Sequence, residues 1–127
     1  MNTLKNNARV ERRYVMFTRH YDTPDEIATK SLSEFTVSST VTHGPNASAL
    51  KKLLKSINKA CLANQPETVA KLTKFILDRR LTEDMDISKM EIILAHTRAV
   101  TLMDPEISVK DFYESLVREH YNYYIIN

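Results

Sequence analysis

The scarcity of glycine is the feature that most restricts the fold of this chain. Gly44 is its only glycine among 127 residues. Tight hairpin turns and phosphate-holding loops depend on glycine, because their backbones take positive φ angles or approach a ligand closely. The sequence therefore excludes the P-loop and the dinucleotide-binding fingerprint. It favours helices that are joined by short polar loops.

Length and hydropathy predict one small, mostly α-helical domain of about five helices that spans 1–127. With 43% hydrophobic residues, the chain has enough apolar surface for one core but not for two. No run of about 18 apolar residues is present, so we expect no membrane helix, and the N-terminus lacks an apolar signal core. The single Cys61 is expected to be buried. We therefore expect a cytoplasmic, reducing compartment.

The N-terminal segment, 1–45, is predicted to combine helix and extended chain. The spacing of Val10, Tyr14, Phe17 and Tyr21 favours a helix, although their neighbours also suit a strand. The run Thr23-Pro24-Asp25-Glu26 is a capping box that begins a short second helix, expected to run through Ile27, Ala28, Ser31 and Leu32. Near 35–42 the apolar residues alternate with threonine and serine, which predicts either a long ordered linker or a short edge strand.

Residues 46–127 form the predicted helical core, because their apolar residues recur with the helical period. One helix is expected over about 47–63, with Asn46 or Ser48 as its N-cap. A second begins at Pro66 and ends near Arg80, and a connection this short predicts an antiparallel hairpin.

Two further helices complete the predicted core. The first begins at Asp86 or Ser88 and ends at Met103-Asp104-Pro105. It is apolar on more than one face, which indicates the central helix of the core. The second begins at Ser108, and its expected core face consists of Val109, Phe112, Leu116 and Val117.

Charge is divided unevenly along the chain. Residues 1–81 carry 14 Lys and Arg against 7 Asp and Glu, a net of +7, whereas 82–127 carry 4 against 9, a net of −5. A row of cations is typical of surfaces that bind phosphate backbones or acidic partners, although it also keeps a helix soluble. A further cluster holds Lys71, Lys74, Arg79 and Arg80. The predicted binding residues form two other clusters, namely Arg9, Arg12, Arg13 and Arg19, and Lys51, Lys52, Lys55 and Lys59.

The acidic third of the chain ends in an unusually aromatic tail. We expect this acidic part either to close onto the basic part or to face a basic partner. Terminal residues are normally polar, so Tyr121, Tyr123 and Tyr124 are expected to dock on the domain or to contact a partner.

No constellation of catalytic or metal-binding residues is apparent. None of the four histidines lies within four residues of another histidine or of the cysteine, so we expect no metal site. The acidic clusters 25–26 and 83–86 fall at helix starts, where they complement the helix dipole. His96 is expected to be a hydrogen-bonded structural residue. We therefore expect neither a cofactor nor an enzymatic activity.

The leading functional hypothesis is a non-enzymatic regulator that docks on a protein partner. The candidate partner is the transcription machinery, for example a host RNA polymerase if the protein is phage-encoded, or another nucleic-acid-bound complex. Small size, mixed charge and scarce glycine are similar to those of accessory proteins of tailed phages. One alternative is direct nucleic-acid binding by a basic helical surface. Another is a small enzyme whose site combines distant residues such as His96 or His120.

Overall fold

The structure is a computed structural model that describes residues 21–40 and 44–121. Helices make up 69% of these residues and no strand occurs among them, which confirms the mostly α fold. None of the described helices is long and apolar enough to cross a membrane. The described elements are α2 (Pro24–Thr29), the 3-10 helix η1 (Leu32–Glu34), α3 (Ala47–Leu62), α4 (Pro66–Asp78), α5 (Asp86–Met103) and α6 (Val109–His120). The helix predicted from Val10 onward lies outside the described residues, apart from Tyr21.

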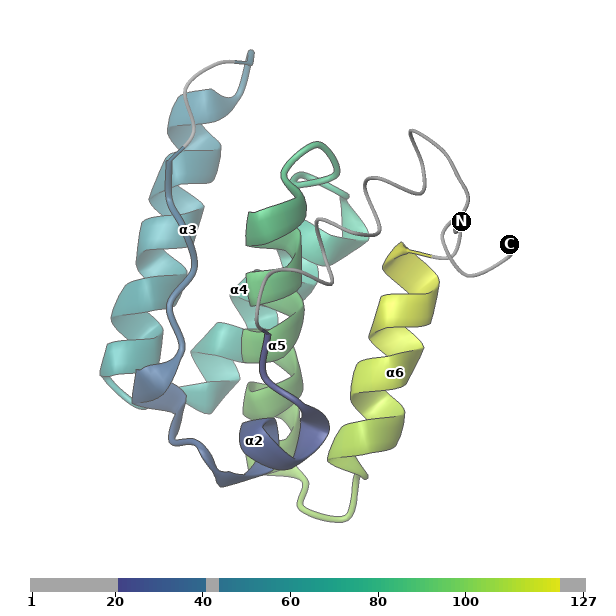
Figure 1. The fold of residues 1–127 in the computed structure, drawn as a ribbon. Coiled ribbons are helices and arrows are strands. Elements are labelled where there is room, and N and C mark those ends of the chain that lie inside the picture. Colours follow the sequence, from purple (N-terminus) through teal and green to yellow (C-terminus); the bar gives the residue numbers. More distant parts are fainter. Residues whose placement is uncertain (1–20, 41–43, 122–127) are drawn as a thin grey trace, which may run out of the picture.

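The central element of the fold is α5. It packs against α4, α6, α2 and η1, and Figure 1 shows it between α3 on one side and α6 on the other, with α4 crossing behind. Eleven of its residues are buried, and they cover more than one face of the helix. This confirms the position that its apolar pattern predicts.

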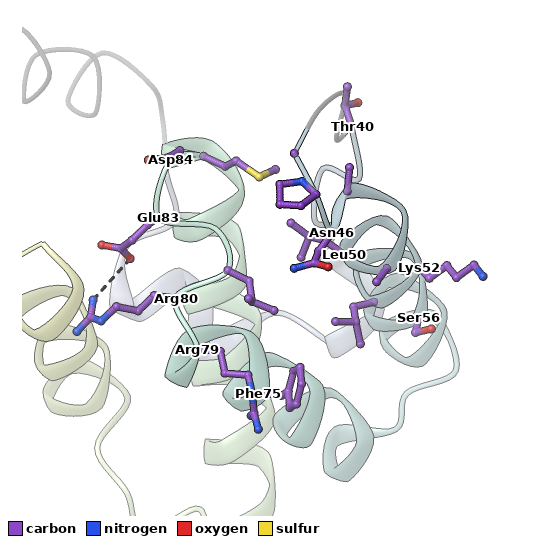
Figure 2. Close-up of a pocket in the computed structure, with 17 residues that line it drawn as sticks. Thr40, Asn46, Leu50, Lys52, Ser56, Phe75, Arg79, Arg80, Glu83 and Asp84 are labelled. Carbon is purple, nitrogen blue, oxygen red and sulfur yellow. Dashed lines mark ion pairs between the residues drawn. The ribbon is translucent and has the colours of Figure 1, made fainter.

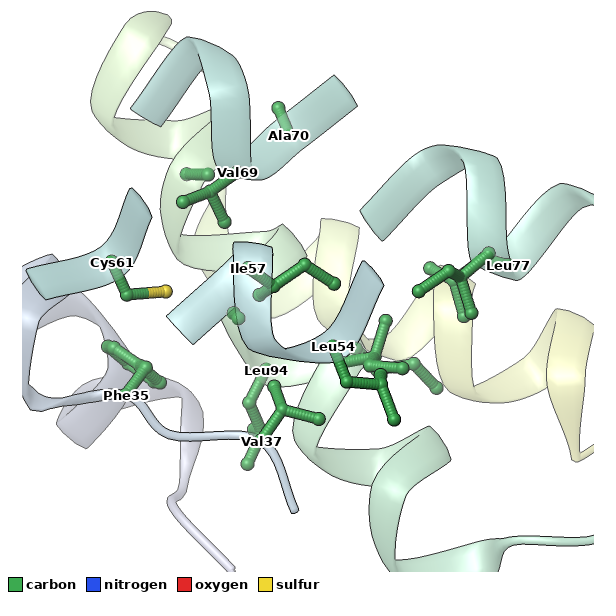
Figure 3. Packing of buried hydrophobic residues seen from close by; sticks show 14 of the residues in the cluster. Phe35, Val37, Leu54, Ile57, Cys61, Val69, Ala70, Leu77 and Leu94 are labelled. Atoms are coloured by element: carbon green, nitrogen blue, oxygen red, sulfur yellow. The ribbon is translucent and has the colours of Figure 1, made fainter. Parts of the chain in front are cut away.

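The helices α3 and α4 pack as the predicted hairpin. Figure 1 shows α4 returning obliquely against the direction of α3. Leu54, Ile57 and Cys61 of α3 are buried in the same cluster as Val69 and Leu77 of α4 (Figure 3). The hydrophobic effect of burying these side chains is the main contribution that stabilises the hairpin.

Both helices of the hairpin end on a left-handed residue, and neither of these residues is glycine. Asn64 (φ 56°) follows α3 and Arg80 (φ 53°) follows α4. After each, the next N–H donates to a carbonyl five positions earlier, which is the Schellman arrangement. The predicted end of α4 near Arg80 is two residues too late, because Arg80 leaves the helical conformation and α4 ends at Asp78.

The segment 35–40 is extended and forms no strand, so the ordered linker is the alternative that the structure supports there. The predicted alternation is present, since Phe35 and Val37 are buried and Thr36 is exposed. Figure 3 shows Phe35 and Val37 directed toward the core residues of α3. The rest of the predicted extended stretch, 41–42, lies outside the described residues.

Side chains from two helices take the place of a strand partner for this segment. The Asn58 amide of α3 accepts from the Val37 N–H at 2.7 Å and donates to the Val37 carbonyl at 2.8 Å. On the side of α5, the Glu91 carboxylate accepts from the Ser38 N–H at 2.8 Å, and the Ser88 hydroxyl donates to the Ser38 carbonyl at 3.3 Å. These bonds satisfy backbone groups that a sheet would otherwise pair.

Thr23, Asn46 and Ser108 all take the predicted N-cap positions, but only Thr23 and Ser108 make the capping bond. Thr23 and Glu26 form the capping box of α2, and the Ser108 hydroxyl caps α6. Asn46 takes the N-cap position of α3 without a capping bond from its side chain, and Ser48 lies inside the helix. The side-chain cap predicted for α3 is therefore wrong. The Asn46 side chain does not cap the helix because the Asn46 backbone (φ −115°, ψ 25°) differs from the extended conformation that such a cap requires.

Candidate functional site

Four exposed lysines form one side of α3, which we call the lysine face: Lys51, Lys52, Lys55 and Lys59. The helix itself contains no Asp or Glu, and none occurs anywhere in 35–66. No carboxylate in the described part of the chain forms an ion pair with any of the four lysines. The lysine face therefore carries positive charge that the described residues do not neutralise.

The sequence of α3 explains why its lysines are exposed. Leu50, Leu54, Ile57 and Cys61 recur with the helical period and are all buried. Burial of this apolar stripe fixes the rotation of the helix about its axis. The lysine face then points into solvent as a geometric consequence.

The acidic helix α6 lies on the other side of the molecule. Its exposed Asp111, Glu114 and Glu119 belong to the acidic third of the chain. Figure 1 shows α5 between α3 and α6, so these carboxylates do not cover the lysine face. The carboxylates of α6 are therefore separated in space from the lysine face, whereas Glu83 and Asp84 of the same acidic third lie closer to α3, in the loop before α5.

Three of the four basic residues of α4 and its end contact other side chains among the described residues. Lys74 pairs with Asp78 at 2.9 Å, and Arg80 pairs with Glu83 of the acidic loop at 3.5 Å. The Arg79 guanidinium instead stacks on the Phe75 ring, 4.0 Å from its centroid.

A cleft of about 950 Å³ lies between α3 and the end of α4. Most of its lining surface is apolar. Leu50 and Leu53 contribute from α3, Phe75 from α4, and Leu81 and Met85 from the loop before α5. Figure 2 shows Phe75 and Arg79 across the cleft from α3, with the Lys52 side chain extending from α3 in the direction away from them. This size lies within the range of cavities that bind small molecules or large side chains.

Lys52 connects this cleft to the lysine face. At about 100° of rotation per residue, Ala49, Leu53 and Ser56 share one side of α3 and line the cleft. Lys52 also lines the cleft. Around the helix axis it lies between the cleft side of α3 and the stripe formed by the other three lysines. A partner in the cleft would therefore also meet the lysine face.

The cleft is a feature that the sequence prediction missed. Phe75 belongs to the apolar pattern that predicts α4, but 39% of its surface is exposed. One signal was available, because Phe75, Ile76 and Leu77 are consecutive and a helix cannot direct three consecutive side chains toward one core. The neighbours across the cleft come from separate parts of the chain, which no local pattern connects.

Several predicted binding residues lie outside the described part of the chain. They are Arg9, Arg12, Arg13, Arg19, Tyr123 and Tyr124. Tyr121 is described and is 1% exposed. Its hydroxyl donates to the Asp86 carbonyl at 3.2 Å, and the Lys89 Nζ lies 4.4 Å from the centroid of its ring. Tyr121 therefore takes the first of its two expected roles, docking on the domain.

The titratable groups considered for chemistry are buried. His96 bonds to the Thr73 hydroxyl at 2.7 Å, as expected of a structural histidine, and burial lowers its pKa to about 4. Burial also lowers the pKa of His120 and raises the pKa of the Cys61 thiol to about 11. Neither His96 nor His120 lines the cleft.

No group of three or more His, Cys, Asp or Glu within 21–40 and 44–121 is arranged to hold a metal ion. Exposed lysines beside an apolar cleft are suited to binding rather than to proton transfer. Comparisons with protein-family models, with curated protein sequences and with solved structures find no match to this chain.

Proposed function

We propose that this protein is a non-enzymatic binding protein that docks on a macromolecular partner with an acidic surface. The observation that carries the proposal is the lysine face, an exposed row of cations on a helix that has no carboxylate. Like charges one turn apart destabilise a helix by a few tenths of a kcal/mol per pair. An acidic partner would relieve this repulsion.

The separation of charge supports docking in one orientation. An acidic partner is attracted by the lysine face, whereas α6 carries three carboxylates against Lys110 and Arg118 and attracts it far less, so approach by the α3 side is favoured. The partner class that we propose is a protein of the transcription machinery or of another nucleic-acid-bound complex.

Affinity capture from bacterial extract tests this function, with the bound proteins identified by mass spectrometry. The lysine-face variant K51E/K55E/K59E is compared with the wild type, with and without nuclease treatment. We expect the wild type to retain a specific protein after nuclease treatment and the lysine-face variant to lose it.

The matched control is K71E/K74E/K110E, which changes the net charge equally at exposed helical positions outside α3. This control should retain the protein. Equal retention by the lysine-face variant would contradict the proposal.

Direct nucleic-acid binding is the second candidate. The observation that favours it is the one-turn spacing of Lys51, Lys55 and Lys59, a row of cations that suits a phosphate backbone. Each phosphate contact adds about −0.9 to the slope of log affinity against log salt on duplex DNA. In this case nuclease would abolish capture. In a titration with duplex DNA, the slope for the lysine-face variant would be shallower than that for the wild type by about 2 to 3.

A further inference from the structure

The cleft beside α3 adds a second kind of recognition to the lysine face. Phe75 lines it with 39% of its surface exposed, and Leu53 on the opposite wall is only partly buried. Such apolar surface in a concave site gains free energy when a partner's apolar side chain displaces water from it.

Arg79 is arranged to bind a carboxylate at the edge of the cleft. Its guanidinium carbon lies over the Phe75 ring, 4.0 Å from the centroid, a distance that suits stacking. Stacking uses the flat faces of the guanidinium and leaves its N–H donors at the edges for paired bonds to a carboxylate. In the described part of the chain Arg79 has no ion-pair partner.

The charges around the cleft favour an acidic occupant. Lys52 lies at the edge of the α3 wall, with its side chain extending outward from α3, and Arg79 lies on the opposite wall (Figure 2). Glu83 lies at the far end and is already paired with Arg80 and Lys89. Asp84 is also at that end, so carboxylates of a partner would be directed toward Lys52 and Arg79.

We propose that the cleft binds a segment of the partner protein in which a bulky apolar side chain is flanked by carboxylates. The apolar side chain lies against Phe75 and Leu53, and the flanking carboxylates bind Arg79 and Lys52. This inference rests on the proposed function and specifies its partner as an acidic amphipathic segment.

Two synthetic peptides of equal negative charge test the inference. One places a Phe and two Leu on a single helical face among glutamates, and in the other Ser replaces these three residues. We expect the wild type to bind the apolar peptide about tenfold more tightly or better, as measured by fluorescence anisotropy, because buried aromatic contacts dominate most interfaces.

Filling the cleft should abolish this preference. Ala49 is exposed and lines the cleft, so Ala49→Trp occupies the space without removing a core contact. The chain has no tryptophan of its own, so the emission of the new side chain reports whether it is shielded from water. Ala63→Trp, at an exposed position that does not line the cleft, is the matched control and should keep the preference.

Replacing Arg79 tests the carboxylate contact separately. Arg79→Lys keeps the charge but loses the paired geometry and the stacking. We expect it to weaken binding of the apolar peptide severalfold, whereas Lys71→Arg should leave binding unchanged.

The outcomes separate this inference from the proposed function. If both peptides bind the wild type equally and K51E/K55E/K59E binds neither, the cleft proposal is overturned and the lysine face still docks an acidic partner. Retention of the preference by Ala49→Trp also overturns the cleft proposal. If neither peptide binds the wild type, both proposals fail. Concentration-dependent self-association that Ala49→Trp abolishes would identify a second copy of this chain as the occupant instead.

Discussion

At the scale of single residues, Thr73 and His96 are buried polar residues that are hydrogen-bonded inside the core. The Thr73 hydroxyl donates to the Val69 carbonyl at 2.6 Å, so its oxygen is the acceptor for the Nδ1–H of His96 at 2.7 Å. Burial against α4 favours the neutral form of His96, and the Phe112 ring of α6 lies 5.8 Å away. The histidine is therefore a packing residue, and its protonation would place an uncompensated charge in the core.

The titration of His96 predicts a loss of stability in mild acid. Its pKa in the folded protein is about 4, whereas an unfolded histidine titrates near 6.5. Between these values the unfolded state binds more protons, so stability falls as the pH is lowered through this window. We expect His96 to account for a loss of about 2 kcal/mol between pH 7 and pH 5.

Urea unfolding of the wild type and of His96→Gln at both pH values measures this loss. The variant should show a smaller decrease in the free energy of unfolding. His120→Gln should keep the contribution of His96. An equal pH dependence in wild type and His96→Gln would show that His96 does not carry the effect.

At the scale of elements, the helices follow from local pattern and the extended segment does not. Apolar periodicity and the capping residues act within a few positions of the chain, so the limits of α3, α4 and α5 were predictable to within two residues. The short helix expected to continue through Leu32 instead ends at Thr29, and Leu32 begins η1. The alternation of apolar and polar residues in 35–40 is also local. Whether this segment forms a linker or a strand, however, depends on which parts of the chain pack beside it. Asn58 and Glu91 decide this, and they come from two different helices.

The bonds of Asn58 to Val37 predict a large effect of one substitution. Asn58→Ala leaves the Val37 N–H and carbonyl without their partner, and each unpaired backbone group at a sheltered site costs about 1 to 3 kcal/mol. We expect a loss of about 2 kcal/mol or more in the free energy of unfolding in urea.

The control for this prediction is Asn46→Ala, because the Asn46 side chain makes no capping bond. It should change stability by less than about 0.5 kcal/mol. Equal effects of the two substitutions would mean that Asn58 does not hold the extended segment.

At the scale of the whole molecule, one buried lysine joins parts that are distant in the sequence. Lys89 is 1% exposed, and its Nζ donates to the His120 carbonyl at 3.1 Å and to the Glu83 carboxylate at 3.3 Å. The same ammonium lies over the Tyr121 ring. It thereby connects the start of α5, the acidic loop and the end of α6.

Lys89→Met therefore predicts a loss of stability despite its similar volume. The carbonyl of His120 would lose its donor and Tyr121 its cation, for a cost of about 2 kcal/mol. Thermal and urea unfolding should show this loss, whereas Lys110→Met, at an exposed position on α6, should be close to neutral. A Lys89→Met protein as stable as the wild type would refute the role of Lys89 in joining these parts.

The sequence by itself determined the helical class, most helix limits and the exposure of the lysine face, because these depend on interactions between residues a few positions apart. Its single glycine already pointed away from hairpins and phosphate loops, and the helix ends use Asn64 and Arg80 in place of glycine. Only the tertiary structure decided that Tyr121 is buried, that α6 lies across α5 from the lysines, and that Phe75 and Leu53 face each other across a cleft. Those outcomes depend on how α3, α4 and α6 pack around α5. Such packing is set by the combined burial of side chains from distant parts of the chain, which no local pattern contains.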